Sequence, residues 1–393
     1  MAPTVSPLRA ADVRQRNEKI VLRLIHSARE RGLSQSEVVL ATGLKPPTIF
    51  RIFSSLEETG YIEPLEKGEE ESRLERKGRR PLAYVAKRDA FYAIGVEFWV
   101  ERISIGVFDF QGASVYSKML ALSRNEDAPA VAALIARLVE EAIASLGLRH
   151  EKILGLGLGA PGEVNVGRRE VTSYQRIPGM KNFPIASILE ERLGLPVFLH
   201  NNCSIVAKSE FRYGGLGDEE SMFMFLLRSG VNGAFVDGGK VFLGPRGTTI
   251  EMGHISIDYD GPPCSCGARG CLEAFITALD RENLDAGRWL FESILAEPRR
   301  GGSGPQGPEA LDLAATYLAS AVQTASRLFR PSSFLFVAYS GEIAEELARR
   351  VGKRLSESRS SFDEVLPRFL GRAYDPGLAQ RGAADLVIDA FLE

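Results

Sequence analysis

Three of the four cysteines in this chain, Cys264, Cys266 and Cys271, lie within eight residues, and His254 precedes them by ten positions. Three thiolates and one imidazole are the donor set of a closed, tetrahedral, structural zinc site. Glycine and proline are frequent around the cysteines, so the segment can turn sharply enough to surround one ion. The alternative is three small buried side chains and a core histidine. Such clustering in a chain with few cysteines favours one structural Zn²⁺ per chain.

The length and composition are those of a globular protein with more than one domain. Of its 393 residues, 45% are apolar and 25% are charged, so we expect two or three domains. No apolar run approaches the length of a membrane span, and residues 1–20 carry charges where a signal peptide would have an apolar core. The cysteines do not resemble a disulfide framework. We therefore expect a cytoplasmic protein with no membrane partner.

The charge is divided unevenly along the chain. Residues 1–88 carry 17 basic and 12 acidic side chains, a net charge of +5, whereas the remaining residues carry a net charge of −8. A basic segment attached to an acidic body indicates an anionic partner at one end of the molecule.

Residues 12–59 have the pattern of three helices. The second begins at Ser34-x-x-Glu37, a capping box, and we expect residues 38–40 to form its buried face. Gly43 supplies a tight turn before the third helix. The third helix has one apolar face, formed by Ile49, Ile52, Phe53 and Leu56. A helix, a glycine-containing turn and a second helix form the helix-turn-helix pattern.

The outward-facing residues of this third helix are candidates for DNA contacts. They are Lys45, Thr48, Arg51 and Ser54. Two short strands near Ile62 and Val85 would flank a wing, with Arg79 and Arg80 at its tip as further candidates. Four glutamates on the same wing count against DNA binding, and the alternative is a packing unit with a solvated charged loop. We expect residues 1–88 to be a winged helix-turn-helix domain that binds operator DNA.

The motif around the cysteines also carries a family resemblance. Glu251-Met-Gly-His254, followed by Cys264-Ser-Cys266 and Cys271-Leu-Glu273, closely resembles the signature of the ROK family of repressors, open reading frames and sugar kinases. The winged helix-turn-helix resembles that of the family's transcriptional-regulator branch. Other segments resemble the family in its order, namely Tyr92–Gly112, Gly155–Val164, Asn182–Asn202, Gly230–Gly247 and Arg381–Ile388.

The resemblance implies an α/β fold with two actin-like, ribonuclease H-like lobes and a cleft between them. The ROK domain would cover residues 89–393. One lobe would span about 89–200 together with the C-terminal helix, and the other about 201–380. The alternation of apolar runs with helical segments such as Ala128–Leu146 and Ile185–Leu193 agrees with this class.

The resemblance also implies a sugar site. Its residues would be Asn201, Asn202, Glu251, His254 and Glu273. Zinc would hold one ring nitrogen of His254 and leave the other facing the sugar, while Cys271 would fix the turn that carries Glu273. The alternative for the two glutamates is salt bridging or solvent exposure.

Several positions depart from the family's kinases. Asn202 stands where the resemblance implies a catalytic aspartate, and an amide cannot accept a proton at neutral pH. The two phosphate loops are replaced by Glu97–Glu101, which carries large side chains, and by Arg228–Asn232. Tyr339-Ser340 replaces a glycine pair on the adenosine side. We therefore expect no catalytic residues and no enzyme activity.

Together these features predict a DNA-binding transcriptional regulator of sugar-metabolism genes. We expect a repressor that is controlled by a monosaccharide or derivative bound in a degenerate, non-catalytic, sugar-kinase-like domain. We expect a dimer or tetramer, since one short recognition helix reads few base pairs. One alternative is an active ATP-dependent sugar kinase. Another is a regulator controlled by a protein partner or a non-sugar ligand.

Overall fold

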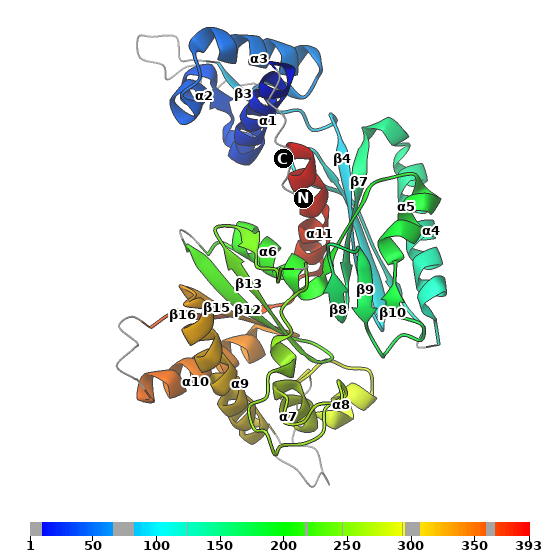
Figure 1. The fold of residues 1–393 in the computed structure, drawn as a ribbon, viewed down its shortest axis with the longest axis vertical. Coiled ribbons are helices and arrows are strands. Elements are labelled where there is room, and N and C mark those ends of the chain that lie inside the picture. Colours follow the sequence, from blue (N-terminus) through cyan, green and yellow to red (C-terminus); the bar gives the residue numbers. More distant parts are fainter. Residues whose placement is uncertain are drawn as a thin grey trace, which may run out of the picture.

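The computed structural model describes residues 10–65, 82–123, 125–216, 219–245, 247–292, 294, 307–358 and 366–393. Figure 1 shows a small N-terminal domain followed by two α/β lobes. The last helix, α11 (Pro376–Leu392), packs on the sheet of the first lobe and also contacts the N-terminal helix α1 (Ala10–Ala28). In the described part of the chain, no helix is long and apolar enough to cross a membrane.

The N-terminal domain has the predicted helix-turn-helix, and its three short strands form an antiparallel sheet of order β1-β3-β2. Ser34 and Glu37 form the predicted capping box: the Glu37 amide donates to Ser34 Oγ at 3.3 Å, and the Ser34 amide donates to Glu37 Oε2 at 2.8 Å. The elements after α1 are β1 (Leu33–Ser34), α2 (Gln35–Thr42), α3 (Pro46–Glu58), β2 (Ile62–Pro64) and β3 (Ala83–Ala86).

One detail of α2 differs from the prediction. Val38 is fully buried, but Leu40 is 86% exposed, so residues 38–40 do not share a buried face. Successive residues of an α-helix are about 100° apart around its axis, and three in a row therefore point in different directions.

The first lobe has a five-stranded sheet of order β11-β7-β4-β5-β6 between helices α4 and α5 on one face and α11 on the other. Gly95 and Gly157 let α11 lie directly on the strands, because neither position has room for a side chain. A Cβ atom at Gly95 would lie 1.9 Å from the Gln380 carbonyl oxygen, and one at Gly157 would lie 1.8 Å from the Ala383 carbonyl oxygen. The sheet comprises β4 (Tyr92–Trp99), β5 (Arg102–Asp109), β6 (Ser114–Ala121), β7 (Ile153–Ala160) and β11 (Val197–Asn201).

The helices α4 (Ala128–Leu146) and α5 (Ile185–Leu193) have the predicted bounds. A small antiparallel sheet extends the same lobe toward the second one. Its strands are β8 (Glu163–Asn165), β9 (Glu170–Ser173) and β10 (Lys181–Phe183).

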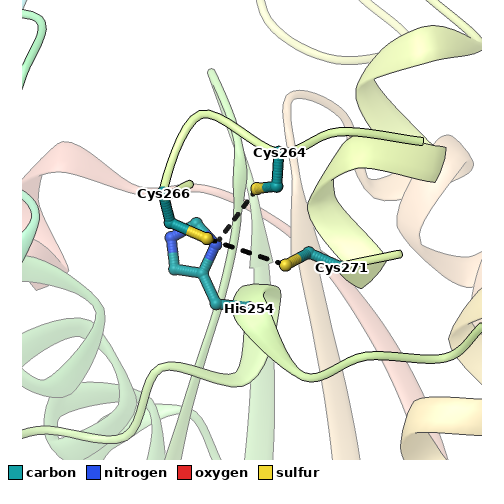
Figure 2. Close-up of side chains that lie close together, drawn as sticks. All are labelled: His254, Cys264, Cys266 and Cys271. Carbon is teal, nitrogen blue, oxygen red and sulfur yellow. Dashed lines mark hydrogen bonds between the residues drawn. The ribbon is translucent and has the colours of Figure 1, made fainter. Parts of the chain in front are cut away.

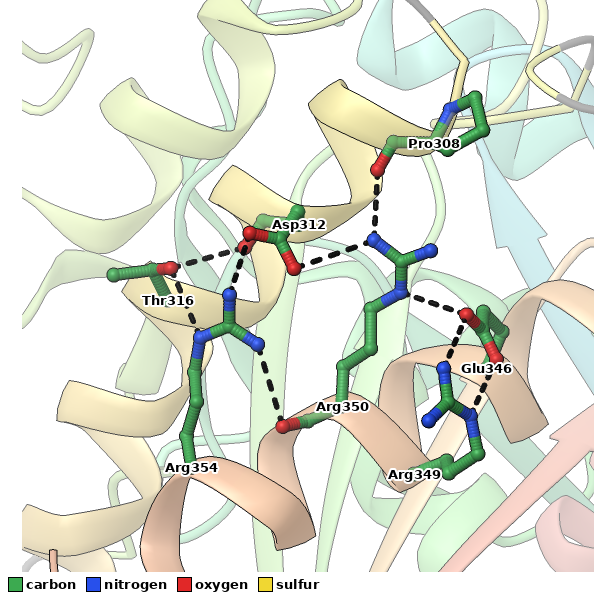
Figure 3. A network of polar contacts seen from close by, with 7 residues as sticks. All are labelled: Pro308, Asp312, Thr316, Glu346, Arg349, Arg350 and Arg354. Carbon is green, nitrogen blue, oxygen red and sulfur yellow. Dashed lines mark hydrogen bonds and ion pairs between the residues drawn. The ribbon is translucent and has the colours of Figure 1, made fainter. Parts of the chain in front are cut away.

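The second lobe repeats this plan with a sheet of order β14-β13-β12-β15-β16. Its buried strands carry a stack of phenylalanines, in which the Phe225 and Phe336 rings lie 5.5 Å apart. Helices α9 and α10 cover one face and are joined by ion pairs in which Asp312 binds Arg350 and Arg354 (Figure 3). The strands are β12 (Ser221–Leu227), β13 (Val231–Asp237), β14 (Lys240–Val241), β15 (Ser333–Ala338) and β16 (Arg368–Ala373). The helices are α7 (Leu272–Ala278), α8 (Arg281–Asp285), α9 (Pro308–Phe329) and α10 (Gly341–Glu357).

Two helices connect the lobes and pack against each other. The chain passes from the first lobe to the second through α6 (Asn202–Tyr213) and returns through α11. Gly382 permits the close approach, because a Cβ atom there would lie 2.2 Å from the Ile205 carbonyl oxygen. Any movement between the lobes must therefore change how α6 and α11 lie against each other.

Candidate metal and ligand site

The four predicted metal ligands come together at one point of the second lobe. The ligand atoms of His254, Cys264, Cys266 and Cys271 all lie within 4.8 Å of one another (Figure 2). His254 ends the 3₁₀ turn η4 (Met252–His254), and Cys271 immediately precedes α7. Gly270 lets the chain turn between the cysteines, because its φ is +69° and a Cβ atom would lie 1.5 Å from the Asp258 carbonyl oxygen.

The distances within this cluster fit a tetrahedral ion. Cys266 Sγ and Cys271 Sγ are 3.7 Å apart, and His254 Nδ1 and Cys264 Sγ are 3.5 Å apart. Ligands at zinc bond lengths in a tetrahedron are separated by about 3.8 Å for two sulfurs and about 3.5 Å for sulfur and nitrogen. The donor set and its spacing therefore suit a metal ion held through Nδ1, which leaves Nε2 on the other side of the imidazole ring.

Glu273 is the second residue of α7 and lies two positions after the candidate ligand Cys271. Its Oε2 atom accepts a hydrogen bond of 2.9 Å from the Val231 amide at the start of β13. The Leu272 amide donates to the Ile255 carbonyl at 2.9 Å, so the turn that carries Glu273 is tied to the residue after His254. These hydrogen bonds hold the Glu273 carboxylate in place, and one of its oxygens already binds the backbone.

Glu251 is half-buried beside the same cluster. Burial, together with the nearby carboxylates of Glu163 and Glu273, raises its pKa to about 8. Thr249 Oγ1 donates to its Oε1 atom at 3.4 Å. A glutamate with this pKa is mostly protonated at neutral pH and can donate as well as accept a hydrogen bond.

The sequence analysis missed Glu163, the third carboxylate of this group. It belongs to β8 of the first lobe, whereas Glu251 and Glu273 belong to the second. The lobes also touch here through a β-bridge between Asn165 and Thr248. The only signal in the sequence was the position of Glu163 within the segment Gly155–Val164.

Asn201 and Asn202 lie where β11 passes into α6, and both are buried. The Asn201 side chain caps α6: Oδ1 accepts from the Cys203 amide at 2.8 Å, and Nδ2 donates to the Gly162 carbonyl at 2.7 Å. Its amide group is thus committed to the backbone. Asn202 is 5% exposed and is the first residue of the helix.

The segments Glu97–Glu101 and Arg228–Asn232 meet between the lobes. Glu97 is completely buried, and its Oε1 atom binds Arg228 Nη1 at 2.8 Å. The Tyr374 hydroxyl donates to the other oxygen of Glu97, since burial and the Glu97 carboxylate raise the Tyr374 pKa well above its usual value. The Arg228 guanidinium lies 4.3 Å from the ring centre of Trp99 and 5.6 Å from that of Trp289. Large side chains therefore fill this region.

The candidate DNA-contacting residues lie along α3. Lys45 precedes the helix and is exposed, as is Arg51, whereas Thr48 and Ser54 are half-buried. Arg79 and Arg80 lie outside the described residues.

Sequence comparison finds two family matches in this chain. Residues 93–390 match the ROK family, and residues 21–66 match the IclR helix-turn-helix domain. The chain is 27% identical to the xylose repressor of Caldicellulosiruptor bescii, over 67% of this chain and 64% of that protein. It is 22% identical to the xylose repressor of Bacillus subtilis, over 97% of both proteins.

The fold is also similar to that of a solved structure. A ROK family transcriptional regulator, described as a homologue of the Escherichia coli Mlc protein, superimposes with a TM-score of 0.76 and 20% identity. The match covers 97% of this chain and 98% of that one, so the similarity extends over the helix-turn-helix domain and both lobes.

Proposed function

The chain belongs to the ROK family, and from this we propose that it is a sugar-responsive transcriptional repressor. The N-terminal domain binds operator DNA, and the two-lobed body binds a monosaccharide that changes the affinity for DNA. The main support for this proposal is that one chain contains both parts. Residues 21–66 match a helix-turn-helix domain, and residues 93–390 match the ROK family. Relatives that are named repressors span the same two parts.

The sugar site of this proposal consists of Glu251, His254 and Glu273, with Asn202 at the start of α6. Their polar groups include a carboxyl that is mostly protonated at neutral pH, an imidazole held by the metal cluster and a carboxylate fixed at α7. Such a group offers both donors and acceptors to sugar hydroxyls. Asn201 is proposed to position the site without contacting the sugar, because its side chain holds the β11–α6 turn in place.

We assign the metal a structural role as Zn²⁺. His254, Cys264, Cys266 and Cys271 would hold it, and the ion would fix η4 and the start of α7 relative to each other. These are the two segments that carry Glu251 and Glu273. The ion would therefore shape the ligand site without contacting the sugar.

The body is proposed to have no kinase activity. Asn202 cannot take a proton from a sugar hydroxyl. The Glu97–Arg228 ion pair and its surrounding aromatic rings occupy the region where glycine-rich loops would approach nucleotide phosphates. Both observations oppose the alternative of an active sugar kinase.

The proposal is tested with the full-length protein and DNA from the region upstream of its own gene. A gel-shift titration is run with a panel of monosaccharides that begins with D-xylose, and binding of each sugar is measured by calorimetry. We expect one sugar to change DNA affinity roughly 5–150-fold, the usual range for coupled sites. No shifted DNA, or no sugar that binds by calorimetry, would contradict the proposal, as would phosphorylation of any of the sugars by ATP.

A further inference from the structure

A polar cavity of about 670 Å³ lies where the N-terminal domain meets the body. The end of α1 and the adjoining 3₁₀ turn η1 (Arg29–Arg31) line one side of it, and α6 and α11 line the other. Its volume is within the usual range for small-molecule sites. Glu251, His254 and Glu273 do not line it, so it is separate from the proposed sugar site.

On the side of the cavity formed by α6 and α11, most charged side chains form ion pairs with one another. Lys208 binds Asp389 at 2.5 Å, and Arg212 binds Asp385 at 2.9 Å and Asp389 at 3.0 Å. These residues come from α6 and α11, the two helices that connect the lobes. Two cations and two carboxylates neutralise one another there, and this wall needs no further ion.

Two arginines of the cavity are not balanced in this way. The Arg381 guanidinium carbon lies 3.8 Å from the ring centre of Tyr213, and that of Arg29 lies 4.4 Å from the same ring centre. The two positive charges are consequently within about 8 Å of each other. Among the described residues, neither forms an ion pair with a carboxylate. Both cations contact the Tyr213 ring, which carries no net charge, so an anion beside them would supply the counter-charge that they lack.

Two further observations indicate that an acceptor is missing from this place. Arg381 Nε is buried and has no hydrogen-bond partner among the described residues. A buried donor without an acceptor destabilises the folded protein. Arg29 also has a φ of +49°, the left-handed conformation that non-glycine residues seldom adopt. Strain of this kind persists where a structure holds a side chain in a particular place.

We propose that this cavity binds a phosphate monoester beside Arg29 and Arg381, which both line it. A monoester carries nearly two negative charges at neutral pH, which matches the two unpaired guanidinium groups. Arginine is suited to phosphate because its planar group donates two parallel hydrogen bonds. The cavity is larger than a phosphate group, so it has room for an organic part beside Tyr213 and the glycine turn at Gly238-Gly239.

A ligand in this position would join the N-terminal domain to the body. Arg29 belongs to the N-terminal domain, and Arg381 belongs to α11, which also contacts α6 and the sheet of the first lobe. Binding would therefore fix the DNA-binding domain relative to the helices that connect the lobes. The binding site does not depend on the proposed function, whereas an effect on DNA affinity does.

The test uses the full-length protein, calorimetry and thermal unfolding, with glucose 6-phosphate, inorganic phosphate and glucose as probes. We expect glucose 6-phosphate to bind and to raise the melting temperature, inorganic phosphate to bind at least tenfold more weakly, and glucose to give no signal that depends on Arg29 or Arg381. Arg29→Asn keeps a residue that tolerates positive φ, and Arg381→Gln keeps most of the side-chain length. Each should weaken glucose 6-phosphate binding about tenfold or more.

The matched control is Arg349→Gln on α10, an arginine already paired with Glu346 (Figure 3). It should leave binding of the phosphate probe unchanged, and circular dichroism should show that all three variants are folded. The proposal is overturned if neither phosphate probe binds the wild type, or if both bind equally. It is also overturned if Arg29→Asn and Arg381→Gln both bind glucose 6-phosphate as the wild type does, whatever the result for Glu251→Gln. Loss of binding in Glu251→Gln would then place the phosphate in the sugar site.

Discussion

Arg228 of the second lobe and Glu97 of the first form a buried ion pair, with Nη1 and Oε1 2.8 Å apart, inside a ring of tryptophan and tyrosine side chains. The two residues are 131 positions apart in the sequence. The pair therefore joins two lobes through side chains that are far apart in the sequence.

Removing one partner of this pair should be strongly destabilising. Arg228→Gln leaves the Glu97 carboxylate buried without its counter-charge, and we expect the free energy of unfolding to fall by about 3–5 kcal/mol. The double variant Glu97→Gln with Arg228→Gln should lose less than the sum of the two single changes. Urea denaturation of all three variants measures this coupling. Arg349→Gln, which breaks an exposed pair, should cost less than about 1 kcal/mol.

A cost below about 1 kcal/mol for Arg228→Gln would show that the pair does not hold the lobes together. Purely additive single and double variants would lead to the same conclusion, since additivity means that the two charges do not interact.

Zinc should be present at one ion per chain and should depend on Cys271. Cys271→Ser removes one of four ligands, and we expect loss of the metal and a lower melting temperature, because metal binding and folding of the site are coupled. Cys203→Ser is the matched control: this thiol is buried in another part of the body and should leave the metal content unchanged. Elemental analysis of protein purified without chelator measures both, and a metal-free wild type would refute the assignment.

His200 should make the protein sensitive to mild acid. Burial lowers its pKa from 6.5 to about 3, and Lys208 contributes in the same direction. Between pH 6.5 and pH 3, His200 is therefore protonated in the unfolded chain but neutral in the folded protein. Since the unfolded state binds the extra proton, the free energy of unfolding falls as pH drops below about 6.5. The expected loss from this residue is about 2 kcal/mol between pH 7 and pH 5.

Comparing variants isolates this contribution from other groups that titrate in the same range. His200→Gln should flatten the dependence of unfolding free energy on pH between 7 and 5 relative to the wild type. His150→Gln removes an exposed histidine and should leave the dependence as it is in the wild type. Equal slopes for wild type and His200→Gln would mean that His200 titrates normally.

DNA binding should depend on residues of α3 and the wing. Replacing Arg79 and Arg80 by alanine should weaken binding and reduce the salt slope by about one to two, since each lost phosphate contact removes about one. Arg51→Ala should also weaken binding. Gel shifts over a range of salt concentrations measure both effects, with Arg349→Ala as the control. An unchanged slope for the pair would mean that it does not contact phosphate.

Glu251→Gln should weaken the response to sugar without affecting DNA binding. Glutamine keeps the shape of the side chain but removes the carboxyl that contacts the sugar in the proposed function. The protonated carboxyl donates through its O–H, which glutamine lacks, and losing a neutral hydrogen bond costs about 0.5–1.5 kcal/mol, so the variant should need roughly two- to tenfold more sugar for the same change in DNA binding. Titrations of wild type and variant with the sugar identified by the gel-shift panel measure this. An unchanged sugar requirement would remove Glu251 from the site.

The sequence predicted those features that depend on local pattern. The bounds of α4 and α5, the capping box at Ser34 and the clustering of the four metal ligands all follow from spacing over a few residues. It did not predict that Glu97 would pair with Arg228 or that Glu163 would lie near Glu251. Those contacts join separate lobes, and nothing within either segment indicates its partner.

The position of α11 sets the order in which this chain can fold during synthesis. β4 and β7 need Gly95 and Gly157 to receive that helix, yet residues 376–392 are translated more than 200 positions after β7 begins. During synthesis, the sheet face of the first lobe that packs against α11 therefore stays uncovered until these residues leave the ribosome. A nascent chain in this state exposes apolar strands, so a chaperone has the longest opportunity to bind here before the repressor is complete.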